Sequence, residues 1–326
     1  MANYRDIHGF QIEIRSDNPS NPVNGQVWYN TTDSKLKGAV VASVGGWSTG
    51  ANINTARKSL EGTGTSNTAA IAFGGTANPP VYALTEQYNG SAWTETADMN
   101  VGRTSTGAAG TSTAAIAFGG GDPSQSQVDE TELWNGTSWS ETADLNTARD
   151  NMGPTMAGTT TAALGAGGSP PTVAITEQWN GTSWTEVGDL NTARYSLAGA
   201  GTVTSGLVWG GAFPQKAQTE SWNGSAWTET ADLNIARYNF AGSGVSNTAA
   251  LAFGGQPGLG GSANETELWN GTSWSEQNNL STAKVGFGSS GTTTSALSFA
   301  GEGPPTLTAT EAWNVPFTTI REFTLS

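Results

Sequence analysis

The chain of 326 residues contains no cysteine and only one histidine, His8. The absence of thiols excludes disulfides, thiol chemistry and cysteine-based zinc sites. Since no cysteine or second histidine could join His8, the sequence predicts no metal centre, and no motif in it calls for a cofactor.

Charged residues are also scarce, at 12% of the chain, and the 27 acids outnumber the 13 lysines and arginines. No basic cluster is present to neutralise phosphates, so nucleic-acid binding is not expected. No run approaches the ~18 apolar residues of a membrane span, and Met1 to Phe10 lacks the apolar core of a secretion signal. Membrane insertion is therefore not expected either.

Glycine and tryptophan are abundant, with 44 and 13 residues, and threonine and serine are frequent. Short strands and tight turns use these residues, whereas a helical protein would be richer in Leu, Glu and Lys. A chain of this length can still form one large domain. The composition therefore predicts an all-β protein.

Three landmarks recur in a fixed order at intervals of 43 to 47 residues. A basic residue is followed by an apolar run ending in two small residues, and then by a Thr-Glu pair leading to an aromatic residue and Asn. The basic positions are Arg57, Arg103, Arg149, Arg194, Arg237 and Lys284. The acidic positions are Glu86, Glu132, Glu177, Glu220, Glu267 and Glu311. Periods of about 40 to 50 residues built from short strands are typical of β-propellers, so six copies predict six blades.

Each repeat contains four predicted strands, the third and fourth joined at an Asn-Gly pair. Examples from different repeats are Tyr195 to Gly201, Ser112 to Phe118, Ile175 to Asn180 and Thr182 to Val187. An Asn-Gly pair between aromatic-rich strands predicts a two-residue type I′ turn. The same Asn-Gly-Ser/Thr triplets match glycosylation acceptors, but turn chemistry explains them without glycans.

The aromatic residues predict how the array closes. Six repeats carry an aromatic residue on the third strand but only five on the fourth, because none follows Trp313 at the expected spacing. Near the other end, Trp47 stands ten residues before a basic repeat position, as fourth-strand tryptophans do. We therefore expect Gly45 to Gly50 to complete blade six, which would remove the exposed sheet edges of an open array.

Three segments follow from this interpretation. Residues 1–43 form an N-terminal attachment segment, and residues 44–314 form the propeller, with blade six completed by about residues 44–50. Residues 315–326 form a C-terminal tail.

The succession Asn-Thr-x-Arg, strand ending in Gly-Gly, Thr-Glu-x-Trp and later Trp resembles the kelch repeat over residues 44–314. The resemblance implies a six-bladed propeller closed by an N-terminal fourth strand. The two-residue turn between the third and fourth strands departs from the longer loop usual in that family. The copper site of the galactose-oxidase relatives cannot be built from one histidine, and the Ser-x-Asp-x-Gly-x-x-Trp box of sialidase propellers is missing.

The repeated side chains have a structural interpretation. The aromatic residues could be sugar-stacking platforms, but one pair in every repeat favours packing between blades. The repeated acids and basic residues indicate an ion pair or backbone hydrogen bonds in each blade, since catalytic acids would stand out against the repeat. A carbohydrate-active enzyme with paired carboxylates is an alternative. No pair is singled out, so no catalytic residue is predicted and the protein is expected not to be an enzyme.

The connections between second and third strands differ between repeats, with lengths of 8 to 11 residues and frequent prolines. Variable loops on a rigid scaffold commonly bind partners, and kelch propellers, by resemblance, often use this face. The candidate binding residues are Tyr82, Asp122, Gln125, Phe213, Gln215, Gln256 and Glu302.

The N-terminal segment does not follow the repeat, and Gly25 to Gly38 predicts a hairpin. Its Gly-x-Val-Trp-Tyr-Asn-Thr-Thr stretch resembles N-terminal pieces of tailed-phage virion proteins. The resemblance implies a structural protein located in the virion that docks on other virion proteins through Val27, Trp28 and Tyr29. Its propeller would then bind a host-surface glycan or protein, or a neighbouring subunit, with homo-oligomerisation left open. The alternatives are a generic capping hairpin and a kelch-type protein-interaction adaptor.

Overall fold

The computed structural model describes residues 12–19, 26–42, 45–77, 79–154, 158–212, 214–258, 261–303, 306–315 and 317–323. The chain divides into unit 1, which comprises Met1–Gly46 and Asn314–Ser326, and unit 2, Trp47–Trp313. Every regular element among the described residues is a β-strand, so the prediction of an all-β protein is confirmed.

Unit 2 consists of strands that recur in groups of four. The first strands are β5 (Glu61–Ser66), β9 (Gly107–Thr111), β13 (Gly153–Pro154), β17 (Ala198–Thr202), β21 (Ala241–Ser246) and β25 (Gly288–Gly291). The second strands are β6 (Ala69–Phe73), β10 (Ala114–Phe118), β14 (Ala163–Ala166), β18 (Ser205–Trp209), β22 (Ala249–Phe253) and β26 (Ser295–Phe299). The third strands are β7 (Thr85–Tyr88), β11 (Thr131–Trp134), β15 (Thr176–Trp179), β19 (Thr219–Trp222), β23 (Thr266–Trp269) and β27 (Thr310–Asn314). The fourth strands are β8 (Trp93–Glu95), β12 (Trp139–Glu141), β16 (Trp184–Glu186), β20 (Trp227–Thr230), β24 (Trp274–Glu276) and β4 (Gly46–Thr49).

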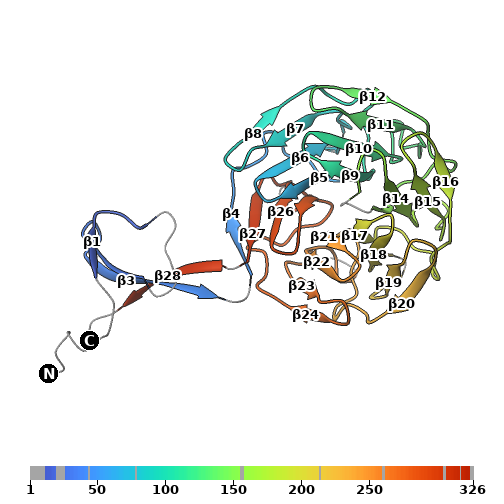
Figure 1. The fold of residues 1–326 in the computed structure, drawn as a ribbon. Helices are drawn as coiled ribbons and strands as arrows, with labels where there is room; N and C mark the ends of the chain where they lie inside the picture. Colours follow the sequence, from blue (N-terminus) through green and yellow to red (C-terminus); the bar gives the residue numbers. More distant parts are fainter. Residues whose placement is uncertain are drawn as a thin grey trace. The chain divides into compact units, whose positions relative to one another are not determined.

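Each group forms one four-stranded sheet, and five of these sheets follow the chain order. The sixth has the order β25-β26-β27-β4, so a strand from the N-terminal side completes a sheet from the C-terminal side. Figure 1 shows the sheets arranged around a common centre, with their first strands nearest to it. First strands of successive sheets contact one another, and β25 contacts β5. This repeated arrangement is typical of a β-propeller.

Three of the four example strands lie where the sequence predicts them. The ranges 112–118, 175–180 and 182–187 contain β10, β15 and β16. The inner strand predicted at 195–201 begins three residues later, as β17, because Ser196 has a left-handed backbone conformation with φ of 52°. Glycine on these inner strands makes room for a neighbouring ring, since a Cβ at Gly107 would lie 2.2 Å from the ring of Phe118.

The predicted type I′ turn at the Asn-Gly pairs is wrong. Strand pairing ends at Trp134 and Trp139, which leaves four residues in the loop, and of its Asn-Gly pair only Gly136 has a positive φ. The Oδ1 atom of Asn135 accepts hydrogen bonds from the backbone N–H groups two and three residues later, at 2.9 and 3.0 Å. This side-chain acceptor stabilises an Asx turn, a conformation that competes with the type I′ turn.

Tryptophans fill the space between successive sheets, as predicted. The ring of Trp139 on the second sheet packs against Phe73 on the first, with ring centroids 4.9 Å apart. Its indole N–H donates a hydrogen bond of 3.0 Å to the hydroxyl of Thr85, which is completely buried. The same bond joins Trp47 to Thr266, Trp93 to Thr310, Trp184 to Thr131, Trp227 to Thr176 and Trp274 to Thr219. Each sheet is thus fastened to the preceding one, and the first to the sixth.

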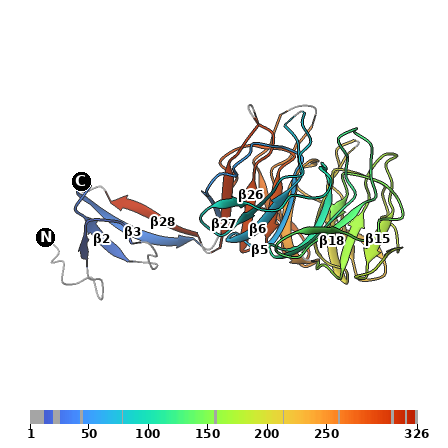
Figure 2. The same ribbon diagram turned by 90° about the horizontal axis from the view of Figure 1, so that it is seen from above.

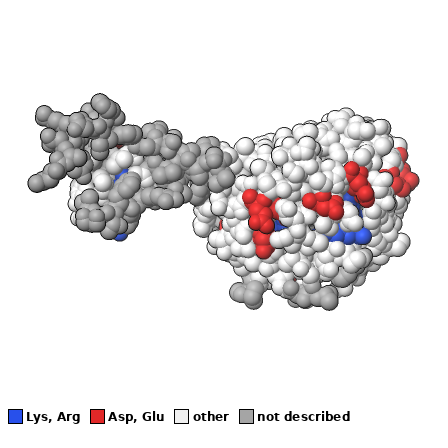
Figure 3. All heavy atoms as spheres, turned by 90° about the horizontal axis from the view of Figure 1, so that it is seen from below, with Lys and Arg blue, Asp and Glu red and all other residues white. Residues whose placement is uncertain are grey.

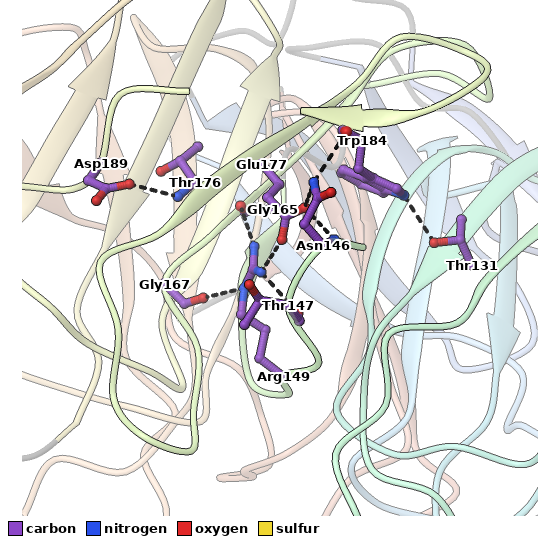
Figure 4. A network of polar contacts seen from close by, with 10 residues as sticks. All are labelled: Thr131, Asn146, Thr147, Arg149, Gly165, Gly167, Thr176, Glu177, Trp184 and Asp189. Carbon is purple, nitrogen blue, oxygen red and sulfur yellow. Dashed lines mark hydrogen bonds and ion pairs between the residues drawn. The ribbon is translucent and has the colours of Figure 1, made fainter. Parts of the chain in front are cut away.

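The predicted ion pairs are confirmed in every sheet of unit 2 and are buried. Figure 4 shows the third sheet, in which Arg149 pairs with Glu177 and donates to the carbonyl oxygen of Gly167 at 3.0 Å. Asn146 donates to the same carboxylate from its backbone and its side-chain nitrogen, both at 2.7 Å. The other pairs are Arg57–Glu86, Arg103–Glu132, Arg194–Glu220, Arg237–Glu267 and Lys284–Glu311. Such hydrogen bonds offset the cost of removing the charges from water.

The sixth pair is the weakest of the set. Lys284 has no guanidinium fork, and its Nζ lies 3.8 Å from the Glu311 carboxylate without a hydrogen bond among the described residues. Burial lowers the pKa of Lys284 to about 8, although Glu311 opposes the shift. The charge of this residue is therefore poorly compensated.

Unit 1 is a single four-stranded sheet of order β1-β2-β3-β28, formed from β1 (Glu13–Arg15), β2 (Val27–Asn30), β3 (Lys35–Ala42) and β28 (Phe317–Phe323). The predicted hairpin is confirmed, since β2 pairs with β3 in antiparallel register around a turn at residues 31–34. The strand β28 comes from the predicted C-terminal tail and pairs with β3 over seven residues, as Figure 2 shows. Both ends of the chain therefore contribute to one sheet.

Replacement of a buried carboxylate should reveal how much unit 2 depends on its ion pairs. We expect Glu220→Gln to lower the free energy of unfolding by about 3 to 5 kcal/mol, because the buried Arg194 guanidinium would lose its counterion. Urea denaturation followed by tryptophan fluorescence measures the change. The same substitution at the exposed Glu186 is the matched control, with an expected change within about 0.5 kcal/mol. Equal effects at the two positions would contradict the assignment.

A pH dependence should distinguish Lys284 from the five arginines. Between pH about 8 and 10.5 the unfolded lysine holds a proton that the folded one has lost, so unfolding takes up a proton and stability rises with pH. A Lys284→Arg variant does not titrate in this window. We expect the stability of the parent protein relative to the variant to increase from pH 8 to 10, as measured by urea denaturation at several pH values. A constant difference would contradict the lowered pKa.

Candidate functional site

A ring of six backbone hydrogen bonds lies on the loop face, the side of unit 2 that carries the second-to-third strand connections. Its members each stand two residues after a basic repeat position and have φ between 51° and 55°. They are Ser59, Ser105, Asn151, Ser196, Asn239 and Gly286. Each N–H donates to the carbonyl oxygen of the member in the preceding sheet, at 2.7 to 3.1 Å, and Ser59 donates to Gly286. The cycle holds five residues other than glycine in a conformation that they rarely adopt.

The ring surrounds a cavity of about 170 Å³, which we call the ring cavity. Below the ring, its wall consists of the residues that begin or directly precede the first strands. These are Leu60, Thr106, Met152, Leu197, Phe240 and Phe287. A second cavity of about 40 Å³ shares several of these residues and extends along the first strands to Ser289. Leu60, Leu197 and Phe240 are only 3%, 4% and 7% exposed, so the accessible lining of the site is mostly polar.

Two carboxyl groups, those of Glu61 and Glu302, belong to the lining of the ring cavity. Glu61 borders both cavities and occupies the repeat position that Phe73 pairs with. The equivalent positions in the other five sheets hold only glycine or alanine, namely Gly107, Gly153, Ala198, Ala241 and Gly288. Burial raises the pKa of Glu61 to about 8, and the N–H of Gly62, which donates to Oε1 at 3.0 Å, opposes the shift only in part.

A separate groove of about 450 Å³ runs between the loops of the first two sheets. It is lined by Thr76, Pro79, Pro80, Val81, Pro123 and Gln125. Proline stiffens a loop by fixing φ, so the groove presents a preorganised, mainly apolar surface.

The predicted binding residues lie around the loop face and do not form one site. Gln125 is exposed in the groove. Glu302 is exposed at the ring cavity and forms an ion pair of 2.9 Å with Lys58, which connects the sixth sheet to the first. The Asp122 carboxylate accepts hydrogen bonds from Ser124 and Ser126 in its own loop, which lower its pKa.

The other predicted binding residues contribute less exposed surface. Tyr82 is half-buried, and its N–H donates to the carbonyl oxygen of Gly75 at 2.7 Å. Gln215 and Gln256 are half-buried on the loops of the fourth and fifth sheets. Phe213 lies outside the described residues. Sequence reasoning missed Glu61, although its departure from the repeat could have revealed it.

In unit 1, the predicted docking residues lie on β2. Trp28 is completely buried, and its indole N–H donates to Asn18 at 3.3 Å, while Val27 and Tyr29 are half-buried. Among the described residues of unit 1, the large apolar side chains that are exposed are those of Ile12 and Ile14, at 43% and 77%. The alternation of apolar and charged residues in Ile12-Glu13-Ile14-Arg15 could have predicted that the two isoleucines share one face, since alternate residues of a strand lie on the same side.

Charged side chains are sparse on the side of unit 2 that Figure 3 shows. There, Asp and Glu form small separate groups on an otherwise largely uncharged surface. Within the described ranges, no three His, Cys, Asp or Glu side chains are grouped so as to hold a metal ion. The described part of the chain also has no helix long and apolar enough to cross a membrane.

Comparison with known proteins adds no relative: no family model matches the chain, and no characterised protein matches its sequence significantly.

The left-handed backbone conformation of the ring residues restricts which side chains these positions tolerate. We expect Ser105→Val to destabilise the protein by about 1 to 3 kcal/mol, because a β-branched residue is strained at a φ of 54°, whereas Ser105→Gly should be close to neutral. Thermal denaturation of both variants measures the difference. The control is Ser140→Val on the exposed face of β12, where little change is expected. Equal tolerance of valine and glycine at position 105 would contradict the ring.

Proposed function

We propose that unit 2 is a six-bladed propeller of the kelch type, closed by β4, and that the chain is a non-enzymatic structural protein of a phage virion. The six-bladed closure is supported by the two hydrogen-bond cycles, one through the ring and one through the indole–threonine bonds. Each cycle passes through all six sheets and returns to its start. The kelch and phage assignments are supported by the sequence patterns.

The observation that carries the virion role is the composition of unit 1. Both ends of the chain meet in its sheet, and the hairpin of β2 and β3 carries the motif that resembles phage virion proteins. A separate small unit formed from both termini is suited to attachment, because the repeated unit then needs no part of its own sheets for docking. The buried Trp28 holds this hairpin in shape.

Docking on a neighbouring virion protein requires an exposed apolar surface in unit 1. Ile14 on β1 and Ile12 directly before it provide one, and β1 lies at the end of the strand order. We therefore add these two residues to the half-buried docking residues Val27 and Tyr29, whereas the predicted docking residue Trp28 is completely buried and supports the hairpin from within. Exposed apolar side chains on an end strand favour contact with another chain.

The loop face would present the binding surface to a host-surface glycan or protein, or to a neighbouring subunit. Its groove is preorganised by prolines and its ring by backbone hydrogen bonds, so little order would have to be gained on binding. An intracellular kelch-type adaptor would use the same face but would have no need of unit 1.

A carbohydrate-active enzyme would need two free carboxyl groups at one cavity. Glu61 and Glu302 both line the ring cavity, but Glu302 is paired with Lys58. The six repeated glutamates are likewise engaged in ion pairs with the basic positions. Because these carboxylates are held in ion pairs, the site favours binding over hydrolysis.

The virion role predicts that the chain is a component of mature particles. Virions purified on a density gradient should contain its peptides, detected by mass spectrometry, and an antibody against unit 2 should label them in immunogold electron microscopy. Presence in infected cells but absence from purified particles would refute the proposal and favour the adaptor.

A charge on the docking surface should prevent incorporation into particles. We expect Ile14→Asp to reduce the copy number per virion at least about tenfold, because a desolvated carboxylate opposes apolar contact. Quantitative mass spectrometry of particles complemented with each variant measures this. The control is Val245→Asp, at a residue of unit 2 that is 51% exposed. Equal incorporation of both variants would remove Ile14 from the docking surface.

A further inference from the structure

We infer that the ring cavity binds a small organic cation, a primary amine little larger than benzene, with its ammonium group on the carboxylate of Glu61. The site depends only on the first strands of unit 2 and their connections. It is therefore independent of the proposed virion role.

Glu61 is half-buried, and its carboxyl group has no ion pair with a cation in the described part of the chain. Its hydrogen bond among the described residues comes from the backbone of Gly62, and no charged side chain contributes to its pKa shift. In the other five sheets this position holds glycine or alanine, so the fold itself does not require a carboxyl group here. A carboxylate that faces a cavity without a counterion favours a positively charged ligand.

The size of the cavity limits that ligand. An engineered cavity of ~150 Å³ in another protein holds benzene. The ring cavity, at about 170 Å³, suits a molecule of similar size. A peptide or an oligosaccharide would not enter, although its end group could.

The residues that line the cavity restrict the chemistry of the ligand beyond its ammonium group. Leu60, Leu197 and Phe240 are 3%, 4% and 7% exposed, so they offer only a narrow apolar edge to a hydrocarbon skeleton. Above them, the ring members carry hydroxyl or amide side chains except at Gly286, so a polar substituent could be hydrogen-bonded there.

The charges near the cavity leave the Glu61 carboxylate without compensation. Arg237 stacks on Phe240 and Lys284 on Phe287, at 5.5 and 5.4 Å from the ring centroids. Each of these cations already has a glutamate partner, Glu267 or Glu311. At the ring, Glu302 is likewise paired with Lys58.

The affinity for the amine should depend on pH in a defined way. The empty site holds a proton below about pH 8, because burial raises the pKa of Glu61 to that value. Ammonium binding requires the ionised carboxylate, so the affinity should fall about tenfold for each pH unit below 8. Above about pH 10 the amine itself loses its proton, and the affinity should fall again.

Calorimetric titration of the full chain at pH 9 tests the inference with three probes. Cyclohexylamine should bind, whereas its neutral analogue cyclohexanol and potassium chloride should not. Glu61→Ala, which introduces the residue type of Ala198 and Ala241, should fold normally and weaken amine binding at least tenfold. Glu141→Gln, on an exposed strand residue, is the control and should bind the amine like the parent.

Each other outcome would overturn the inference or its predicted pH dependence. Equal binding of amine and alcohol would indicate an apolar cavity only, and competition by potassium would indicate a metal-cation site. Amine binding that Glu61→Ala leaves unchanged would exclude Glu61 as the anchor, and binding that does not weaken between pH 9 and 7 would contradict the raised pKa of Glu61. Cooperative thermal unfolding of the variant confirms that a loss of binding is not a loss of fold.

Discussion

A buried cation in each sheet of unit 2 determines the path of the chain on the loop face. Its side chain is paired with the glutamate of its own sheet, and its backbone carbonyl accepts a hydrogen bond from the second small residue of the preceding sheet, as Arg149 does from Gly120 at 3.0 Å. The residue is thus held from two sheets at once. Two residues later the chain is constrained to the left-handed conformation, which places Asn151 in the ring. The pairs, the ring and the cavity are consequences of this one arrangement.

Much of the fold could be predicted because the same residues for ion pairing and packing recur in six repeats. The buried pairing of Arg194 with Glu220, and the packing of Trp139 on the preceding sheet, follow from residue types that make sense only in a repeated sheet. The Asn-Gly loops could not be predicted correctly, because the side chain of Asn135 competes with the backbone for the same N–H groups. Pairing of β28 with β3 joins residues far apart in the sequence, and no local pattern specifies it.

The candidate site was less predictable than the fold, because it consists of exceptions to the repeat. Loop length and proline content pointed to the groove that includes Gln125, but the ring arises from backbone conformation, which composition does not reveal. The sixth sheet has Lys284 where the others have arginine, and the first has Glu61 where the others have glycine or alanine. The repeated residues serve packing, and the single positions that differ from them introduce new charged groups.

The pairing of β4 with β27 has a mechanical consequence. Two chain segments connect unit 1 to unit 2, one leading into β4 and the other leaving β27, and these strands are neighbours in one sheet. A pulling force transmitted through unit 1 therefore enters a single sheet from both segments. Because β4 and β27 are pulled together, the load falls on the hydrogen bonds that join β27 to β26 and on the contacts of this sheet with its neighbours.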